Sequence, residues 1–487
     1  MITRLPFLLK FIFLVCVICA AASFVEAQDR FFDGKSPIST SVLVTRALRD
    51  GFLPLSGGFA PPAGGPLPNI QASEGGSPVN EDPIMVNPNN PQQMLTGGND
   101  FNCPNSQGFY SSNNAGRTWS HYCKLTTSGH VGEGDPGVGY DLNGNSYIGG
   151  VDGGSSDAVV IQKSSDNGAT WSAPNVAVLP LFSGGLPDKD WLQIDINPSS
   201  PHANSLYISV TQLDANDSQI TVSHSTDGGR TWTMVPVDSK QTYPEGDQFR
   251  DLAIGKDGTV YVSWMHCTGN GPAGDCGDTL ASMMFSKSTD GRNTWSAPVV
   301  MAQVTLAPDT CGAYWGCLPN TNERVSNIPA IDIDNSNGSH KGTLYAVMYN
   351  WTGSKMQVGV VRSANGGSTW SAFVPVSPAS SGDQFFPWLS VSSAGVVGAT
   401  WLDRRDDPNN LEYITYATGS TNGGASFVAS KRIGTAPSNP NNDGQGGFFM
   451  GDYTGNYWAT ATNLVSSWMD SRNGVNMQDE VGGFRLK

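Results

Sequence analysis

The sequence predicts an all-β fold built from small sheets that repeat along the chain. One observation is a phrase of the form S-x-D-x-G-x-T-W, in which Asn can replace Asp, that recurs at residues 112–119, 164–171, 225–232, 288–295, 363–370 and, less perfectly, 420–427. The copies are separated by roughly fifty to seventy residues, a period typical of four-stranded repeat units with loop insertions. Composition is the other observation, because 58 glycines and only 14% charged residues suit many short strands and tight turns.

Each copy of the phrase predicts a hairpin turn. In the clearest copy, the Ser225 hydroxyl and the Asp227 carboxylate are placed to accept backbone N–H groups of the turn, and the glycines allow positive φ angles. Trp232 then begins the outgoing strand and packs between neighbouring sheets. Turn chemistry explains the whole phrase, so we assign it to the scaffold.

A second pattern alternates with the first and sets the number of sheets. A polar residue opens an apolar strand at seven places: Asp82, Asp135, Asp190, Asp247, Asn327, Asp383 and Asp452. Seven openings favour seven sheets, with six as the alternative. The stretch after Asp452 has room for about three strands, so its fourth strand is expected from the N-terminal arm.

The repeated phrase is the Asp box, and with six copies the chain resembles the sialidase-like β-propellers with BNR repeats. The resemblance implies a propeller of four-stranded blades over residues 77–487. In such a blade the box joins the third and fourth strands on one face. The starts of the first strands and the ends of the second strands therefore lie on the opposite face, where we expect a pocket.

The N-terminus is expected to direct export. Residues 1–27 contain an apolar run flanked by Arg4 and Lys10 and end in Val25-Glu26-Ala27, a pattern typical of a secretory signal peptide. The run is too short to span a membrane, and no later stretch is a candidate span. Residues 28–76 are rich in proline and glycine and predict an extended arm, in which 40–45 could be a closing strand. A pro-region or linker is the alternative.

The cysteines that follow the signal peptide are even in number, which in an exported chain indicates disulfides. The simplest pairing is local and joins Cys103 with Cys123, Cys267 with Cys276, and Cys311 with Cys317. Zinc is the alternative, but no C-x-x-C spacing supports it. By connectivity, all six fall on the face opposite the boxes.

The net charge of −15 argues against nucleic acid or an anionic membrane as a partner. The resemblance to sialidase-like propellers implies a glycan or polysaccharide as the partner. No cofactor is expected to be required. Converging carboxylates at Asp247, Asp383 and Asp452 are candidate ligands of a structural Ca²⁺ ion. The alternative is that each accepts backbone N–H groups where one blade meets the next.

Two tryptophan-containing loops are the least repetitive polar features. They contain Trp401, Asp403 and Arg404 in one case, and Trp468, Asp470 and Arg472 in the other. An arginine fork suits a carboxylate or sulfate, and tryptophan offers an apolar surface for a sugar ring. Internal ion pairs that shape the loops are the alternative.

The resemblance to sialidases implies roles for these residues. Arg250, Arg404 and Arg472 would grip the substrate carboxylate, and Asp403 or Asp470 would be the acid. Tyr243 or Tyr453 would be the nucleophile, with Glu245 or Glu323 as its base, since a neutral phenol avoids bringing an anion against an anionic sugar. The sequence lacks the Arg-Ile-Pro phrase of sialidases, because Arg324 is displaced from Asn327-Ile328-Pro329. His266 is a further candidate acid or base.

Two hypotheses of function follow. In the first, the protein is a secreted carbohydrate-active enzyme that hydrolyses a terminal, acidic sugar. In the second, it is a non-catalytic propeller that binds a glycan or a protein at or outside the cell surface, because a fold does not determine an activity.

Overall fold

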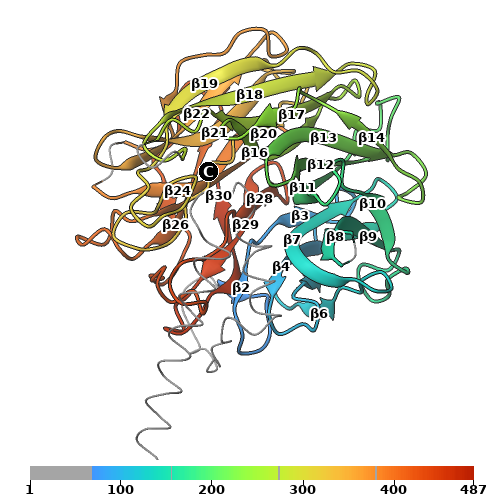
Figure 1. The fold of residues 1–487 in the computed structure, drawn as a ribbon, viewed down its shortest axis with the longest axis horizontal. Helices are drawn as coiled ribbons and strands as arrows, with labels where there is room; N and C mark the ends of the chain where they lie inside the picture. The colour runs from blue at the N-terminus through green and yellow to red at the C-terminus, as the bar shows by residue number, and fades with distance from the viewer. Residues whose placement is uncertain (1–68, 155, 272–274, 379–380, 487) are drawn as a thin grey trace, which may run out of the picture.

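The computed structural model describes residues 69–154, 156–271, 275–378 and 381–486, and these form seven antiparallel sheets arranged as the blades of a β-propeller (Figure 1). The predicted all-β fold and the preference for seven blades are confirmed. The predicted signal peptide and the candidate strand at 40–45 lie outside the described residues.

The first four blades follow the chain in order. Blade 1 contains β2 (Val79–Asn80), β3 (Ile84–Val86), β4 (Met94–Asp100), β5 (Gly108–Ser112) and β6 (Ser120–Cys123). Blade 2 contains β7 (Val131–Tyr140), β8 (Ser146–Gly153), β9 (Ala158–Ser164) and β10 (Asn175–Val178). Blade 3 contains β11 (Leu186–Ile194), β12 (Leu206–Leu213), β13 (Asp217–Ser225), β14 (Thr233–Pro236) and the short β15 (Gln241–Thr242). Blade 4 contains β16 (Gly246–Ile254), β17 (Val260–Cys267), β18 (Leu280–Ser288) and β19 (Val299–Thr305).

The last three blades complete the ring. Blade 5 contains β20 (Ala330–Ile333), β21 (Leu344–Trp351), β22 (Met356–Ser363) and β23 (Val374–Pro375). Blade 6 contains β24 (Gln384–Val391), β25 (Val397–Asp403), β26 (Ile414–Ser420) and β27 (Lys431–Arg432). Blade 7 contains β28 (Gly455–Trp458), β29 (Asn463–Asp470), β30 (Gln478–Arg485) and β1 (Ile70–Gln71).

The ring closes by joining the two ends of the described chain. The outer strand of blade 7 is β1, in which Ile70 pairs with Val481 and Gln71 with Glu480 of β30. On the inner side, β28 contacts β3 of blade 1, as successive inner strands contact one another around the ring. Closure gives every inner strand a neighbour on both sides in the ring, so the inner edges of the sheets are protected.

The Asp boxes form the predicted turns. Ser225 Oγ accepts a hydrogen bond from Gly229 N at 3.0 Å, and Asp227 Oδ1 accepts one from Thr231 N at 3.0 Å. Gly228 and Gly229 have φ angles of 74° and 84°, so the turn needs residues that tolerate the left-handed region. The box therefore has the scaffold role that its turn chemistry predicts.

The inner strands carry bulges that the sequence pattern does not reveal. In β11 the pairing with β12 shifts between Asp188 and Trp191, and Lys189 has a φ of 55°. Asp135, Phe249 and Glu81 have similar positive φ angles at corresponding places in blades 2, 4 and 1. A bulge locally breaks the alternation of side chains and re-aims them. Here it directs several successive polar side chains into the interior.

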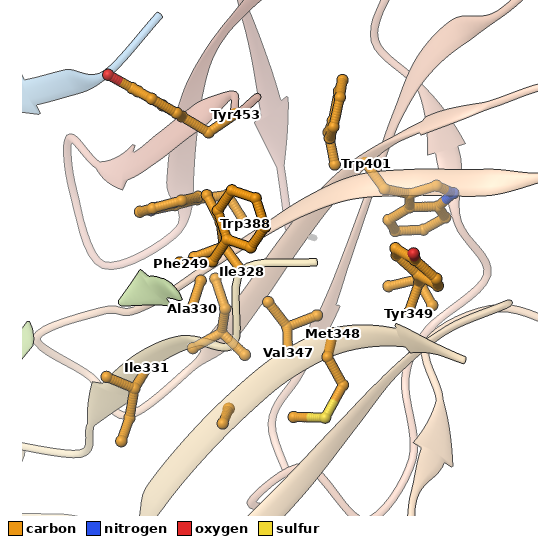
Figure 2. Close-up of a cluster of buried hydrophobic side chains, with 14 of the residues drawn as sticks. Phe249, Ile328, Ala330, Ile331, Val347, Met348, Tyr349, Trp388, Trp401 and Tyr453 are labelled. Carbon is orange, nitrogen blue, oxygen red and sulfur yellow. The ribbon is translucent and has the colours of Figure 1, made fainter. Parts of the chain in front are cut away.

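The hydrophobic core lies between adjacent blades. In the part drawn in Figure 2, Val347, Met348 and Tyr349 of β21 pack near Trp388 of β24 and Trp401 of β25. All five are at most 5% exposed. Such inter-blade packing is expected when each sheet is apolar on both faces.

The three predicted disulfides are present: Cys103–Cys123, Cys267–Cys276 and Cys311–Cys317. All lie on the face opposite the Asp boxes, at loops that follow second or fourth strands, and we name it the disulfide face. Three disulfides indicate an extracellular or otherwise oxidising compartment. Within the described ranges, no helix has the length and apolar character needed to cross a membrane.

Candidate active site at the propeller axis

Ionisable side chains from six blades meet near the start of the inner strands. We name as the axial cluster the nine residues Glu81, Asp135, Asp188, Lys189, Asp190, Arg250, Arg324, Asp452 and Tyr453. Each is at most 5% exposed. Buried charges are costly unless they are paired, so the partners of each group determine whether the cluster is stable.

Two arginines of the axial cluster are held by different kinds of acceptor. Arg324 forms a two-pronged ion pair with Asp452, in which Nε lies 3.1 Å from Oδ1 and Nη2 contacts Oδ2. Arg250 donates from Nη2 to the backbone oxygen of Asp188 at 2.7 Å and from Nη1 to Thr211 Oγ1 at 3.2 Å. Its Nε has no hydrogen-bond partner among the described residues.

The third cation, Lys189, lies over an aromatic ring. Its Nζ is 3.3 Å from the centre of the Tyr453 ring and has no hydrogen-bond partner in the described part of the chain. Burial lowers the pKa of Lys189 to about 8, against the attraction of Glu81. A lysine with a pKa this low exchanges its proton readily near neutral pH.

The carboxyl groups have raised pKa values. Burial, followed by repulsion from Asp135, holds the pKa of Asp190 well above its usual range. Neither Asp190 oxygen has a hydrogen-bond partner within the described ranges. Burial and the charges of Asp135 and Asp452 also raise the pKa of Glu81, whose Oε1 accepts the Asp452 N–H at 3.1 Å. A raised pKa lets a buried carboxyl group hold, donate or accept a proton closer to neutral pH.

Tyr453 reaches into the cluster from blade 7. Its hydroxyl donates to the backbone oxygen of Pro136 at 3.2 Å, and its ring meets the Trp191 ring edge-on at 5.6 Å. In Figure 2 the hydroxyl points away from the apolar side chains. Burial raises the pKa of Tyr453 well above its usual range, and the charge of Glu81 raises it further. The phenol is therefore neutral and has an acidic group close by.

A disulfide-bearing loop places Arg324. Cys317 pairs with Arg324 in an isolated antiparallel bridge, so the Cys311–Cys317 disulfide fixes the loop that carries this arginine. Phe249 and Phe449 lie 5.7 Å and 5.9 Å from the guanidinium carbon and cover it. The loop therefore helps to build the axial cluster.

The three arginines of the predicted trio have separate partners in this structure. Of the three, only Arg250 is in the axial cluster. Arg404 is fully buried and donates to the backbone oxygen of Pro319 at 2.7 Å. Arg472 binds Asp470 through Nε at 2.8 Å and Nη2 at 2.6 Å. The three guanidinium groups belong to blades 4, 6 and 7, and each has acceptors of its own.

The tryptophan-containing loops are internal corners. Trp401 Nε1 donates to Asp403 Oδ2 at 2.7 Å, and Trp468 Nε1 donates to Asp470 Oδ2 at 3.0 Å. The arginine two positions after each aspartate closes the corner, so the counterpart of Arg472 is Arg405 and not Arg404. Both tryptophans are at most 1% exposed, so in this arrangement neither ring offers a surface to a sugar. The aspartate and arginine of each corner thus form an internal ion pair, which was the alternative that the sequence left open.

Tyr243 and Glu245 lie at the rim of the disulfide face. Tyr243 is 38% exposed, with its ring 6.0 Å from that of Tyr314, and Glu245 is exposed. The hydrogen bond that Asp247 accepts and the charge of Asp247 raise the pKa of His266, and the charge of Glu245 raises it further. The structure thus places Tyr243 and Glu245 at the solvent-exposed rim and outside the axial cluster.

His266 belongs to a chain of three ionisable groups. Its Nδ1 lies 2.9 Å from Asp247 Oδ1, which also accepts Trp264 Nε1 at 3.1 Å. Burial, and then the hydrogen bond with Asp247, raise the pKa of Asp238 to about 10. Asp238, Asp247 and the partly exposed imidazole of His266 thus form a connected chain along which a proton can pass.

The candidate calcium ligands do not share a site. Asp247 binds His266, and Asp452 binds Arg324. Asp383 Oδ1 accepts the Met356 N–H at 2.8 Å, and its Oδ2 accepts Asn410 Nδ2 at 2.6 Å. Each carboxylate has protein partners of its own, as in the alternative in which the strand-opening aspartates accept local donors.

Several residues of the axial cluster escaped the sequence analysis. Glu81, Asp188 and Lys189 directly precede strand openings, and Arg324 lies just before Asn327-Ile328-Pro329. Adjacency to an opening was the available signal. This signal did not show that the residues meet, because in a regular strand neighbouring side chains point to opposite faces of the sheet.

Comparisons with known proteins support the fold. No model of a known protein family matches the sequence, and no curated protein matches it either. An ulvan lyase structure has a TM-score of 0.52 at 12% identity, covering 84% of this chain and 94% of that chain. The lectin BP39L from Burkholderia pseudomallei has a TM-score of 0.52 at 12% identity, with coverages of 81% and 93%.

An intramolecular trans-sialidase from Ruminococcus gnavus is similar at a TM-score of 0.43 and 12% identity, covering 69% of this chain and 91% of that one. The chain is thus a seven-bladed propeller distantly similar to proteins that cleave or bind carbohydrates. At these identities the similarity shows the fold alone.

Proposed function

We propose that the protein is a secreted carbohydrate-active enzyme that hydrolyses a terminal acidic sugar from a glycan or polysaccharide at the axial cluster. The observation that carries this proposal is the meeting of Tyr453 with acids of raised pKa and with three cations at one end of the channel. Perturbed pKa values concentrate at functional sites because catalysis needs groups that hold or release protons near the working pH.

The groups divide into three roles. Tyr453 is the nucleophile, and Glu81 is the base that takes its proton. Asp190 is the acid that protonates the leaving oxygen, since burial raises its pKa and neither of its oxygens has a hydrogen-bond partner within the described residues. Arg250 and Arg324 bind the acidic group of the sugar. The side chains are buried, so substrate entry requires the residues that cover Arg324, including Phe449, to move aside.

The test is hydrolysis of a panel of chromogenic acidic and neutral glycosides by the secreted protein. Tyr453→Phe and Asp190→Asn are each expected to lower kcat/KM on the best acidic glycoside by about 100-fold or more. The matched control is Tyr349→Phe, which alters a fully buried tyrosine of blade 5 whose hydroxyl accepts the Ala307 N–H at 3.3 Å. Equal losses in Tyr453→Phe and Tyr349→Phe would assign Tyr453 to the scaffold.

A second candidate function is glycan binding without catalysis. Burial of the axial cluster and internal pairing of the corner arginines favour it, because a binding surface needs neither a nucleophile nor an acid. Retention of a glycan on an array by folded protein that turns over no glycoside in the panel would support this function over the first.

A further inference from the structure

A disulfide in blade 1 lies against an imidazole ring. Cys103 is in the loop between β4 and β5, and Cys123 ends β6. His121, also on β6, places Nε2 3.3 Å from Cys103 Sγ and 3.8 Å from Cys123 Sγ. The His121 side chain is 21% exposed, so the group is reachable from solvent.

A buried carboxylate completes the group. Asp100 Oδ2 lies 3.0 Å from His121 Nε2 and 3.7 Å from Cys103 Sγ. Asp100 is held in place by Tyr110, whose hydroxyl donates to Oδ2 at 2.7 Å, and by Asn102 N, which donates to Oδ1 at 2.8 Å. The imidazole is held as well, since its ring stacks on Tyr110 at 5.2 Å.

These separations match those of a tetrahedral zinc site. With Zn–S near 2.3 Å and Zn–N near 2.0 Å, the ligand atoms of such a site lie roughly 3.3 to 3.8 Å apart. The two sulfur–nitrogen distances and the oxygen–sulfur distance fall in this range, and the oxygen–nitrogen distance is slightly shorter. The two sulfurs must separate, which breaking the disulfide permits. Asp100 must also move toward Cys123, because the group whose ligand atoms all lie within 4.8 Å of one another contains only Cys103, His121 and Cys123.

The other disulfides lack this arrangement. Cys311 and Cys317 lie close to the Asp309 carboxylate, but that group has no imidazole. Cys267 and Cys276 belong to no such group among the described residues. The blade 1 set is therefore distinguished by its borderline-soft nitrogen ligand and its fixed carboxylate, which together suit zinc.

We propose that Cys103, Cys123 and His121, with Asp100 as the fourth ligand, bind one Zn²⁺ ion when the disulfide is reduced. A dithiol supplies two electrons and two protons, and it becomes a cyclic disulfide while Cys103 and Cys123 become thiols. Zinc then displaces the two thiol protons and binds both thiolates. The imidazole binds through Nε2 as the neutral ring. The metal and the disulfide are thus alternative staples between β6 and the β4–β5 loop.

The experiment uses the exported chain with Cys311→Ser and Cys317→Ser, so that the second thiol pair cannot compete. The protein is reduced, freed of reductant without air, and titrated with Co²⁺ and then Zn²⁺. We expect one Co²⁺ per chain with the visible absorption of a tetrahedral thiolate site, displaced by an equivalent of Zn²⁺. The oxidised protein is expected to bind none.

Matched variants locate the ion. His121→Ala and Asp100→Asn are each expected to weaken Zn²⁺ binding by about ten- to a hundredfold, while Cys267→Ser with Cys276→Ser leaves it unchanged. Stoichiometric uptake that persists in Cys103→Ser with Cys123→Ser would overturn the proposal, as would no uptake by reduced, folded protein. If the reduced chain unfolds, recovery of tryptophan fluorescence on adding Zn²⁺ replaces the titration, and no recovery overturns the proposal equally.

Discussion

The axial cluster and the two tryptophan corners contain the same kinds of side chain and differ in how completely these are satisfied. In the blade 7 corner, both oxygens of Asp470 accept hydrogen bonds from Arg472 or Trp468. In the axial cluster, neither oxygen of Asp190 has such a partner among the described residues. A satisfied buried pair serves the scaffold, whereas an unsatisfied buried acid costs stability and is retained where it has another use.

Substitutions in the tryptophan-containing corners should therefore cause the largest loss of stability. Asp470→Ala leaves the guanidinium of Arg472 without its main partner in a largely buried position, and is expected to lower the free energy of unfolding by about 3 kcal/mol. Urea denaturation followed by tryptophan fluorescence measures this loss.

Glu412→Ala is the matched control, because this carboxylate is exposed and its loss should cost no more than about 0.5 kcal/mol. If both variants unfold at the same urea concentration as the wild type, the Asp470–Arg472 ion pair does not stabilise the scaffold, which contradicts the contrast between the corners and the axial cluster.

The axial acid should show the opposite behaviour. The folded pKa of Asp190 lies well above its unfolded value, so the folded state binds more protons and stability falls as pH rises between the two values. Asp190→Asn removes that penalty and is expected to stabilise the protein by about 1 to 3 kcal/mol at pH 9.

The gain from Asp190→Asn should be smaller at pH 5, because that pH lies only about one unit above the unfolded pKa of an aspartate, where the penalty begins. Urea denaturation at both pH values makes the test. An equal gain at pH 5 and pH 9 would mean that the carboxyl is not protonated by burial.

The Asp boxes should give the smallest effect, with the reverse pH dependence. Hydrogen bonds from Thr231 N and neighbouring donors lower the pKa of Asp227 below its usual range. Its stabilising contribution is therefore present above the unfolded pKa, near 4, and is lost as pH falls through the folded pKa. Asp227→Ala is expected to cost no more than about 1 kcal/mol at pH 7, since the turn is solvent-exposed.

Asp227→Asn provides the refinement, because three boxes carry Asn at 114, 365 and 422. This variant should retain most of the stability of the wild type at pH 7. The contribution of position 227 to stability should no longer change as the pH falls. A thermal denaturation series from pH 7 to pH 2 compares the three proteins, and a wild-type box whose contribution stays constant on acidification would contradict the assignment.

The sequence was most informative where the relevant interactions are local. The box turn is formed by residues within one phrase, from Ser225 to Trp232, and the same hydrogen bonds recur wherever the phrase does. The three disulfides join near neighbours in the chain, and their pairing was predicted for that reason. The count of strand openings predicted seven blades because each opening begins one inner strand.

The candidate site was predictable only in part. Arg250, Asp452 and Tyr453 were singled out and do meet, but the partners that give them their properties come from blades 1, 2, 3 and 5. Arg404 was chosen from its motif, although the residue that closes that corner is Arg405. Sequence adjacency could not distinguish the two arginines, because one points to a backbone carbonyl of another loop and the other folds back on its own aspartate.

By itself, the sequence determined the repeated turns, the number of blades and the pairing of the cysteines, since each depends on residues close together in the chain or on simple counting. Only the tertiary structure decided which ionisable groups meet at the axis. A bulge interrupts the alternation of side chains between the two faces of the inner strand. Asp188, Lys189 and Asp190 are therefore all buried. Ring closure then brings Glu81 beside Asp452, residues separated by most of the chain.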